Sequence, residues 1–467
     1  MFRFGGYIRR QSQVGWKANR MMMPSISSGA LGPLQVSGSN SRYFTNRGGK
    51  AIILAGSHTW DNRQDIQGAA VFDWIGYLDD LETWGHNFIR LWVWIESKNI
   101  TTSPAPVDSD ALISPEVYKR TGPGNANDGG LKFDLTQYNQ VHFDRLRTRC
   151  IEAGNRGIYV SIMLFQGWGI DLKGGGLNPW IHHPYSGDNN INSIEGDPNS
   201  NDSGRETHTL DISAVTDLQE SYVEKVIDTV NDLDNVLYEI SNESYSDSVA
   251  WQNHMIDHIH TYEATKSKQH PVWFTGESGI TNADMLASNA EAIAPSPGTG
   301  YDDPPAADGT KVLINDTDHV YGIGGNAAWA WRTFSRGLNP IYMDSWANQV
   351  IDASGSGHPI QNFRDNLGYI RSLANLADLI STVPQNGGTS PCQTGYCLYG
   401  GEQYICYQPN SGNFNLDLTS ESGTFNIRKV NLANGSIDTA QTVTGGAVRS
   451  ITQPSGWTSG WACLVNK

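Results

Sequence analysis

Eight short β-rich runs alternate with helical stretches over most of the chain, and no other feature restricts its fold as strongly. The runs lie at 51–58, 87–96, 158–165, 236–243, 271–278, 291–296, 311–318 and 339–346. Amphipathic helical patterns follow several of them, at 72–85, 143–157, 218–232 and 362–380. Such βα units predict an α/β fold, a closed (β/α)8 TIM barrel, in preference to an open doubly wound sheet. In the sixth unit, 291–309, Pro and Gly argue against a regular helix.

Two connections in this pattern are far longer than the usual length of about two to six residues. They cover 98–134 after the second run and 167–213 after the third, and both are rich in Gly, Asn, Pro and Asp. This composition predicts loops. Because each follows a strand, both are expected at the C-terminal face of the barrel, where barrel enzymes keep their active sites. We expect them to wall a cleft.

After about residue 382 the pattern changes to short alternating strands separated by turns. These runs lie at 402–408, 413–418, 424–430, 436–443, 447–452 and 461–467. They predict a small antiparallel β-sandwich. The expected division is an N-terminal leader or extension at 1–33, the barrel at 34–381 and the sandwich at 382–467.

The composition argues against two classes of partner. With 32 basic and 48 acidic side chains, the formal net charge is −16, which disfavours binding to nucleic acid. The apolar runs are far shorter than the roughly 20 residues that span a bilayer, so no membrane partner is expected. The first 25 residues carry basic but no acidic side chains and lack the apolar core of a secretory signal, which leaves a basic leader, a misplaced start or a remnant as readings.

Four of the five cysteines lie in the last quarter of the chain: Cys392, Cys397, Cys406 and Cys463. Cys392 and Cys397 are close enough in sequence to form a disulfide. Cys150 lies in a helical pattern and is expected to be a buried thiol. The redox compartment and the oligomeric state stay open.

Carboxylates at the ends of two runs suggest chemistry. In "VLYEISNES" the strand alternation predicts that Glu239, Ser241 and Glu243 point the same way, with Glu243 at the C-terminal tip. In "KVLINDTDH" the seventh run ends at Asp316, and Asp318 follows on the same side. Two carboxylates at the tips of strands four and seven can flank the anomeric carbon of a sugar.

These motifs carry a resemblance to a known group of proteins. "YEISNES", with Asn-Glu at the end of strand four, resembles the acid/base signature of clan A glycoside hydrolases. "RYFTNRGGKAIILAGSHTW", "HNFIRLWVW", "INDTDHVYGIGGN", "FSRGLNPIYMD" and the terminal strands resemble bacterial barrel-plus-sandwich glycosidases of the apiosidase-like and related uncharacterised families. The resemblance runs from about residue 34 to the end of the chain.

The resemblance implies a retaining glycoside hydrolase acting on a polysaccharide or oligosaccharide. It implies that Glu243 is the general acid/base, that Asn242 contacts the sugar 2-hydroxyl and that Asp316 is the nucleophile. Clan members usually carry Glu at the nucleophile position, so Asp318 is a rival and Glu277 a more distant one. The resemblance also implies export, to the periplasm or the outside of the cell, although the N-terminus shows no signal.

Further polar and aromatic residues near the predicted strand tips suit a carbohydrate, because indole rings stack on sugars and polar groups bind hydroxyls. Arg90 either pairs with a uronate or orients Glu243 or Asp316. The expected substrate-binding residues are Asn242, His58, Trp60, Arg90, Trp92, Trp94, Gln166, Trp168, Glu277, His319 and Asp344.

Neither a metal nor a cofactor is expected. His254 and His258 are one helical turn apart, but the Glu of the H-E-x-x-H zinc motif is absent. Gly322, Gly324 and Gly325 do not complete a dinucleotide fingerprint. The alternatives to a glycosidase are a non-catalytic carbohydrate-binding barrel and a metal-dependent hydrolase. The sugar, its linkage and exo or endo attack are not encoded in these motifs.

Overall fold

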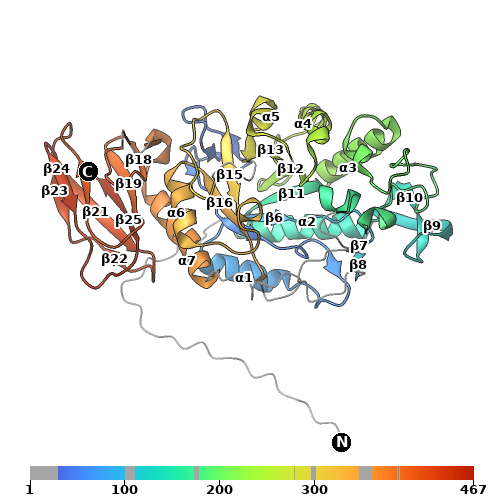
Figure 1. Cartoon of the computed structure of the whole chain (residues 1–467), viewed down its shortest axis with the longest axis horizontal. Helices are drawn as coiled ribbons and strands as arrows, with labels where there is room; N and C mark the ends of the chain where they lie inside the picture. The colour runs from blue at the N-terminus through green and yellow to red at the C-terminus, as the bar shows by residue number, and fades with distance from the viewer. Residues whose placement is uncertain are drawn as a thin grey trace, which may run out of the picture.

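The structure is a computed structural model that describes residues 30–99, 111–172, 178–277, 279–295, 301–346, 360–385, 388 and 390–467. The ends of two predicted strand runs, Ser278 and Ser296, lie outside these residues, as does the predicted extension except for 30–33. The barrel and the C-terminal sheets lie side by side along the long axis of the molecule (Figure 1). None of the helices among the described residues is long and apolar enough to cross a bilayer.

All eight predicted strand runs contribute to one closed parallel barrel, which confirms the predicted fold class. Its strands in order are β4 (Gly56–His58), β6 (Phe88–Leu91), β11 (Tyr159–Gln166), β12 (Val236–Asn242), β13 (Val272–Thr275), β14 (Ala292–Ala294), β15 (Val312–Asp316) and β16 (Asn339–Met343). The last strand pairs with the first, so the sheet has no open edge. The C-terminal ends of the strands therefore surround one common centre.

Helices cover the outside of the barrel. They are α1 (Trp74–Trp84), α2 (Gln140–Asn155), α3 (Ser213–Val230), α4 (Val249–Glu263), α5 (Asn282–Ala287), α6 (Ala327–Ser335) and α7 (Ile360–Leu376). Helix α1 shows how local sequence sets the bounds: Asp73 caps its N-terminus, and Gly85 ends it with a φ of 77°. The described residues between β14 and β15 hold no helix, as the Pro and Gly content predicts.

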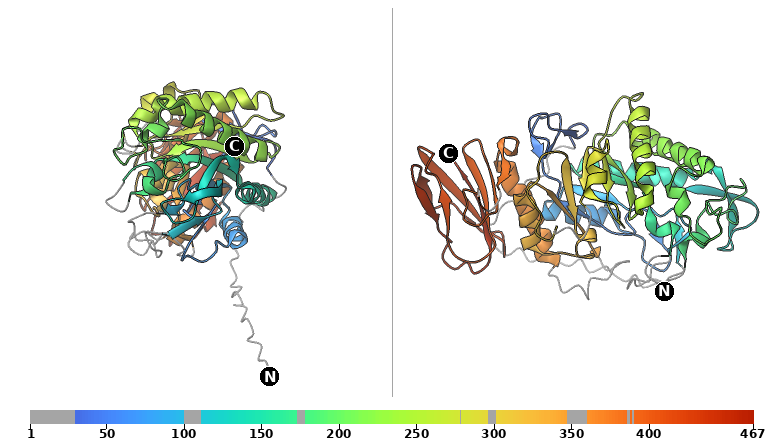
Figure 2. Two further views of the ribbon diagram at one scale, coloured as in Figure 1. Left: turned by 90° about the vertical axis from the view of Figure 1, so that its right-hand side faces the viewer. Right: turned by 45° about the horizontal axis from the view of Figure 1, so that its top comes forward.

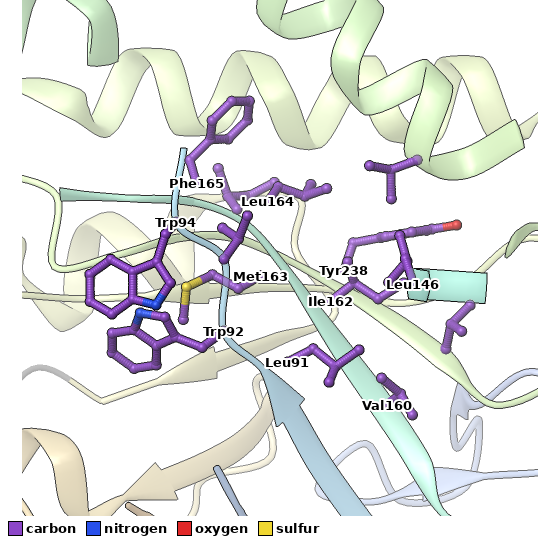
Figure 3. Close-up of a cluster of buried hydrophobic side chains, with 14 of the residues drawn as sticks. Leu91, Trp92, Trp94, Leu146, Val160, Ile162, Met163, Leu164, Phe165 and Tyr238 are labelled. Atoms are coloured by element: carbon purple, nitrogen blue, oxygen red, sulfur yellow. The ribbon is translucent and has the colours of Figure 1, made fainter. Parts of the chain in front are cut away.

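The main core lies between the barrel and its helices. The aromatic ring of Phe165 on β11 contacts Tyr222 of α3 and Trp251 of α4, with ring centroids 5.5 and 5.2 Å apart. Figure 3 shows part of this cluster, with Trp92 and Trp94 side by side and Met163 next to them. The ring centroids of these two tryptophans are 5.8 Å apart.

A small antiparallel sheet packs at the N-terminal end of the barrel strands. It consists of β1 (Gln35–Val36), β2 (Phe44–Thr45) and β3 (Ala51–Ile52). Phe44 joins an apolar cluster with residues at the starts of barrel strands, including Phe88 and Tyr159. This sheet therefore covers the N-terminal end of the barrel.

The first long connection is not a loop, and this prediction is wrong. It contains β7 (Lys98–Asn99), β8 (Ala111–Ser114), β9 (Tyr118–Asn125) and β10 (Leu131–Tyr138). Strands β9 and β10 form a hairpin at the end of the molecule away from the C-terminal sheets (Figure 2), and β8 pairs with β7 and with β5 (Asp65–Ile66). Glycines hid the hairpin in the sequence, because they serve its bends: Gly122, Gly124 and Gly129 have positive φ angles.

The second long connection does lack strands in its described part. It contains three short 3-10 helices, η1 (Gly167–Ile170), η2 (Pro179–His182) and η3 (Arg205–His208). The backbone of Gly204 donates a hydrogen bond to the carbonyl of Ile170 and so joins the first and third of these turns. Among the described residues, η1 contacts η2, η3 and β12.

The C-terminal strands form two antiparallel sheets, as predicted. The larger sheet contains β17 (Val383–Gln385), β18 (Cys397–Gly400), β19 (Gln403–Gln408), β25 (Trp461–Asn466), β21 (Thr424–Asn431), β22 (Ile437–Asp438) and β23 (Thr442–Thr444). The smaller sheet pairs β20 (Phe414–Asp417) with β24 (Val448–Ile451). The sequence did not predict β17 and β18, and the predicted run 436–443 is divided into β22 and β23. The boundary at residue 382 stays a prediction.

The larger sheet packs on α6 and α7 of the barrel (Figure 1). The rings of Trp331 and Tyr407 stack with centroids 6.2 Å apart. The side-chain amides of Asn362 and Asn366 donate hydrogen bonds of 3.0 and 2.9 Å to the carbonyl of Leu432. The barrel and the larger C-terminal sheet share one apolar cluster.

Candidate active site

A buried arginine lies at the centre of the C-terminal end of the barrel. Arg90 on β6 donates through Nε and Nη2 to the two carboxylate oxygens of Glu239, at 2.7 and 2.5 Å. Its Nη2 also donates to Oδ1 of Asn242 at 2.5 Å. Its Nη1 reaches Asp316 and Asp318, at 3.3 and 3.4 Å. One guanidinium thus connects the ends of strands β12 and β15.

The surroundings of Arg90 leave it no contact with solvent. Its guanidinium carbon lies 5.2 Å from the ring of Trp92 and 5.5 Å from that of Trp273, and its side chain has no exposed surface. Burial acts to lower the pKa of Arg90, but the charge of Glu239, and then those of Asp316 and Asp318, raise it above its ordinary value. Arg90 therefore organises carboxylates and offers no surface to a substrate.

Asp316 is held on both of its oxygens. His58 Nε2 lies 3.1 Å from Oδ1 and 3.0 Å from Oδ2, and the backbone N–H of Asp318 donates to Oδ1 at 3.1 Å. Burial acts to raise the pKa of Asp316, but His58 and then Arg90 outweigh it and hold the pKa well below its ordinary value. Asp316 is therefore an ionised and almost fully enclosed carboxylate.

Asp318 is held more loosely and meets other acids. Two polar groups contact its Oδ2: Arg90 Nη1 at 3.4 Å and His319 Nε2 at 3.8 Å. Burial, followed by the charges of Glu243 and Asp316, raises the pKa of Asp318 well above its ordinary value. The prediction that Asp316 and Asp318 lie on the same side is confirmed, because both bind Nη1 of Arg90.

Glu243 lies where β12 ends and the backbone turns. Its φ is 52°, a left-handed conformation that non-glycine residues seldom adopt, and its side chain is partly buried. The Asn242 amide donates to Glu243 Oε1 at 3.4 Å. A Cβ on Gly167 would lie 2.2 Å from the Glu243 carbonyl oxygen, so glycine is needed beside this turn.

The expected common direction of Glu239, Ser241 and Glu243 is wrong. Glu239 binds Arg90 inside the barrel, whereas the Ser241 hydroxyl lies 2.6 Å from that of Ser244. Asn242, not Ser241, continues the direction of Glu239 by binding Arg90. The strand ends at Asn242, and the left-handed φ of Glu243 breaks the alternation there.

His319 and Glu277 complete the polar cluster. His319 Nε2 lies 3.2 Å from Oδ1 of Asn242 and 3.9 Å from a carboxylate oxygen of Glu277. Burial lowers the pKa of His319 to about 4, so its ring is neutral at neutral pH and donates from Nε2. Glu277, at the end of β13, thus brings a further carboxyl to the same centre.

The predicted tryptophans are mostly interior. His58 stacks on Trp92 at 5.6 Å, and Trp60 contacts Trp92 and Trp94 with centroids 6.2 Å apart in both cases. These three indoles are buried, whereas Trp168 is partly exposed. The ring of Trp92 contacts Arg90, and Trp168 is the one of the four that is not buried.

Two predicted polar residues bind protein groups instead. Gln166 donates to both oxygens of Glu96, at 3.0 and 3.1 Å, and accepts from the backbone of Trp168. Asp344 pairs with Arg364 of α7 at 2.5 Å and accepts from the Tyr342 hydroxyl at 2.6 Å. Gln166 therefore fixes the rim next to Asn242, and Asp344 fixes a helix outside the central cluster.

Three residues of the centre were missed as site residues. Glu239 and Trp273 hold Arg90, and Thr275 donates to Glu239 at 2.9 Å. A charged residue in the middle of an apolar strand was the available signal for Glu239. Among the described residues, no group of three or more His, Cys, Asp or Glu is arranged to hold a metal ion.

Comparisons with known proteins agree with the fold. Residues 114–292, less than half of the chain, match a family described as a domain of unknown function, DUF6298. A glycoside hydrolase family 5 structure from Bacteroides vulgatus is similar over 94% of this chain and 95% of its own, with 14% identity and a TM-score of 0.59. Another structure, named a glycoside hydrolase, covers 93% and 97%, with 13% identity and a TM-score of 0.56. No curated protein sequence matches the chain.

Proposed function

We propose that the protein is a retaining glycoside hydrolase that cleaves O-glycosidic bonds of a polysaccharide or oligosaccharide. The observation that carries the proposal is the arrangement of Glu243, Asp316 and Asp318 at the ends of barrel strands four and seven, joined through Arg90 and Asn242. A fold shared with glycoside hydrolase structures agrees with this arrangement.

The protonation of the cluster suits this chemistry. A retaining glycosidase needs one protonated and one ionised carboxyl at neutral pH. Because the charge of Glu243 helps to raise the pKa of Asp318, Asp318 ionises more readily when Glu243 is protonated, which is the combination of states that the reaction needs. We assign the donor role to Glu243 on the resemblance of its motif, and the nucleophile to the strand-seven pair.

Of the strand-seven pair, Asp318 is the better placed nucleophile, and Asp316 is the alternative. Asp316 has both oxygens engaged by His58, Arg90 and a backbone N–H. Asp318 has one weakly held oxygen, and its charge interacts with that of Glu243. In this assignment Asp316 orients Asp318, because its side chain caps the turn that carries Asp318.

The proposed reaction has two steps. In the first, the Asp318 carboxylate attacks the anomeric carbon while Glu243 gives its proton to the leaving glycosidic oxygen, which forms a glycosyl-enzyme ester. In the second, Glu243 takes a proton from water, the water attacks the anomeric carbon and Asp318 leaves as a carboxylate. The Asn242 amide has its oxygen fixed by Arg90 and His319, which leaves its nitrogen to face Glu243 and a sugar hydroxyl.

The test is turnover on a broad panel of polysaccharides, followed by chromatography of released sugars. Wild-type protein is expected to release products, and Glu243→Gln is expected to lose at least about a hundredfold in rate while still binding the same glycan. Glu220→Gln, which alters an acid on α3 far from the centre, is the matched control. Full activity of Glu243→Gln would remove the assignment, and binding without turnover by wild type would favour a carbohydrate-binding protein.

A further inference from the structure

A buried acid beside the site binds protein groups with both of its oxygens. Glu96 lies in the segment that follows β6, and only 2% of its surface is exposed. The side-chain amide of Gln166 donates to its two oxygens, at 3.0 and 3.1 Å. The backbone N–H of Ile95 donates to Oε2 at 3.1 Å. The carboxyl of Glu96 is therefore engaged inside the protein and is not available to a substrate.

Gln166 connects Glu96 to the η1 turn. Because its Nε2 donates to Glu96, its Oε1 accepts a hydrogen bond from the backbone N–H of Trp168, at 2.7 Å. Gln166 is in this way the N-terminal cap of η1. A side-chain amide carries its donor and its acceptor on different atoms, so the carboxyl of Glu96 decides which way the Gln166 amide faces. The cap of η1 thus depends on Glu96.

The η1 turn packs closely against both Glu96 and Glu243. A Cβ on Gly169 would lie 2.3 Å from Oε2 of Glu96. A Cβ on Gly167 would lie 2.2 Å from the carbonyl oxygen of Glu243. Two glycines of one short turn therefore allow it to approach the two acids without space for another atom. Because close-packed interiors transmit displacements, a shift of η1 at Glu96 moves the backbone of Glu243 as well.

A second set of contacts joins η1 to the residue after Glu243. The carbonyl of Ile170, at the end of η1, accepts a hydrogen bond of 2.6 Å from the backbone of Gly204, which precedes η3. At the end of η3, Nδ1 of His208 lies 2.9 Å from the hydroxyl of Ser244. Glu243 has a φ of 52°, a conformation that persists only where the surrounding structure supports it. The η1 turn is part of that support.

We propose that Glu96 is a positioning residue for the candidate acid/base Glu243, a role that rests on the proposed function and acts through Gln166 and η1. The carboxyl of Glu96 keeps the Gln166 amide in the orientation that caps η1. The capped turn then holds the backbone of Glu243 where its carboxyl can protonate the leaving oxygen. A proton donor must lie within about 3 Å of that oxygen, so a displaced Glu243 transfers its proton less well.

The dependence of the rate on the leaving group tests this role. A dinitrophenolate leaves without help from an acid, whereas a sugar alcohol needs the proton of Glu243. Glu96→Gln is expected to lose about tenfold or more in kcat/KM on an oligosaccharide of the sugar identified by the panel, and less than about threefold on its dinitrophenyl glycoside. A merely structural role would lower both values equally. Equal losses, or no loss on either substrate, would overturn the proposal.

An exchange of the two groups supplies a rescue. In the double variant Glu96→Gln/Gln166→Glu, the amide at position 96 can donate to the carboxyl at position 166, which can still accept from the backbone of Trp168. The double variant is expected to cleave the oligosaccharide faster than either single variant. A double variant slower than both would contradict the proposed hydrogen-bond chain.

Glu263→Gln is the matched control. It alters another buried glutamate, which binds Asn231, Tyr238 and His270. This variant is expected to lose stability but to keep the leaving-group dependence of wild type. A selective loss on the oligosaccharide in Glu263→Gln as well would show that any buried charge has this effect, and would contradict a specific role of Glu96.

Hydrogen exchange separates failure of this proposal from failure of the proposed function. A wild type that is silent on every glycan would remove the proposed function, whereas exchange needs no turnover. In Glu96→Gln, peptides that cover η1 and the turn at Glu243 are expected to exchange faster than in wild type, because both open locally. In Glu263→Gln they are expected to exchange as in wild type. Faster exchange at η1 alone would show that the displacement does not reach Glu243, and would overturn the proposal.

Discussion

Arg90 and Glu239 form a two-point ion pair inside the barrel, with Nε–Oε2 and Nη2–Oε1 distances of 2.7 and 2.5 Å and no exposed side-chain surface on either partner. The pair fixes the orientation of the guanidinium. Its remaining contacts, to Asn242, Asp316 and Asp318, are then fixed as well. We infer that Glu239 is a positioning residue that acts on the candidate catalytic acids through Arg90.

Glu239→Gln tests this role. Removing one partner of a buried ion pair leaves an uncompensated charge and is expected to cost about 3 kcal/mol in the free energy of unfolding. The activity per folded molecule is expected to fall about tenfold or more, because the guanidinium can rotate. Urea unfolding and kcat/KM measure the two effects. Asp232→Asn is the control, since its exposed pair with Arg147 is worth less than about 1 kcal/mol.

Gly167→Ala tests the close approach beside Glu243. The added Cβ would lie 2.2 Å from the Glu243 carbonyl oxygen, so the turn that carries Glu243 must move. A displacement of about 1 Å can cost a factor of about a hundred in rate, and we expect a loss of this order in kcat. Gly38→Ala, where no atom lies within 4 Å of the new Cβ, is expected to leave kcat unchanged. Equal activity in the two variants would contradict the described geometry.

Glu96→Gln tests the electrostatics of the rim. Burial raises the pKa of Glu96 to about 7, so the folded state favours its protonated form. This contribution to stability is present below the ordinary pKa near 4.5 and is lost as the pH rises to about 7 and beyond, with a total of about 3 kcal/mol. The glutamine side chain does not titrate. The free energy of unfolding of Glu96→Gln is therefore expected to rise relative to that of wild type as the pH increases from 5 to 8. A constant difference across this range would refute the assignment.

Asp344→Asn separates a structural carboxylate from the site. Asp344 was a predicted substrate-binding residue, yet it pairs with Arg364 and accepts from Tyr342. We expect a loss of about 2 to 3 kcal/mol in the free energy of unfolding, as for other broken buried pairs. We expect kcat/KM of the folded fraction to stay within about threefold of wild type. A large loss of kcat/KM with unchanged stability would place Asp344 in the site.

Most of the fold was predictable from the periodicity of the sequence. The eight barrel strands were predictable because parallel strands buried on both faces read as continuous apolar runs. The β9–β10 hairpin was not, because its glycines resemble those of a loop until their φ angles are known. Motif position likewise predicted that Glu243, Asp316 and Asp318 lie at the ends of strands four and seven. Arg90 contacts Asp316 and Asp318, and Asn242 connects Arg90 to Glu243.

Side-chain direction was the harder part of the site. Strand alternation does not reveal that Asn242, and not Ser241, points in the direction of Glu239. This side-chain direction allows Asn242 to bind Arg90, whereas Ser241 binds Ser244. The burial of Trp92 and Trp94 was also not predictable, because the sequence does not distinguish a tryptophan that packs on a buried cation from one that faces a sugar. Packing between distant segments sets both features.

The most direct measurement compares the azide products of two variants on an activated aryl glycoside of the sugar identified by the panel. In a retaining enzyme, azide replaces water in an acid/base variant and attacks the glycosyl-enzyme, whereas it replaces the carboxylate itself in a nucleophile variant. We predict that Glu243→Ala yields the glycosyl azide with the anomeric configuration of the substrate and that Asp318→Ala yields the opposite anomer. Rescue of Asp316→Ala with inversion in place of Asp318→Ala would move the nucleophile to Asp316. Inverted azide from Glu243→Ala would contradict the central claim.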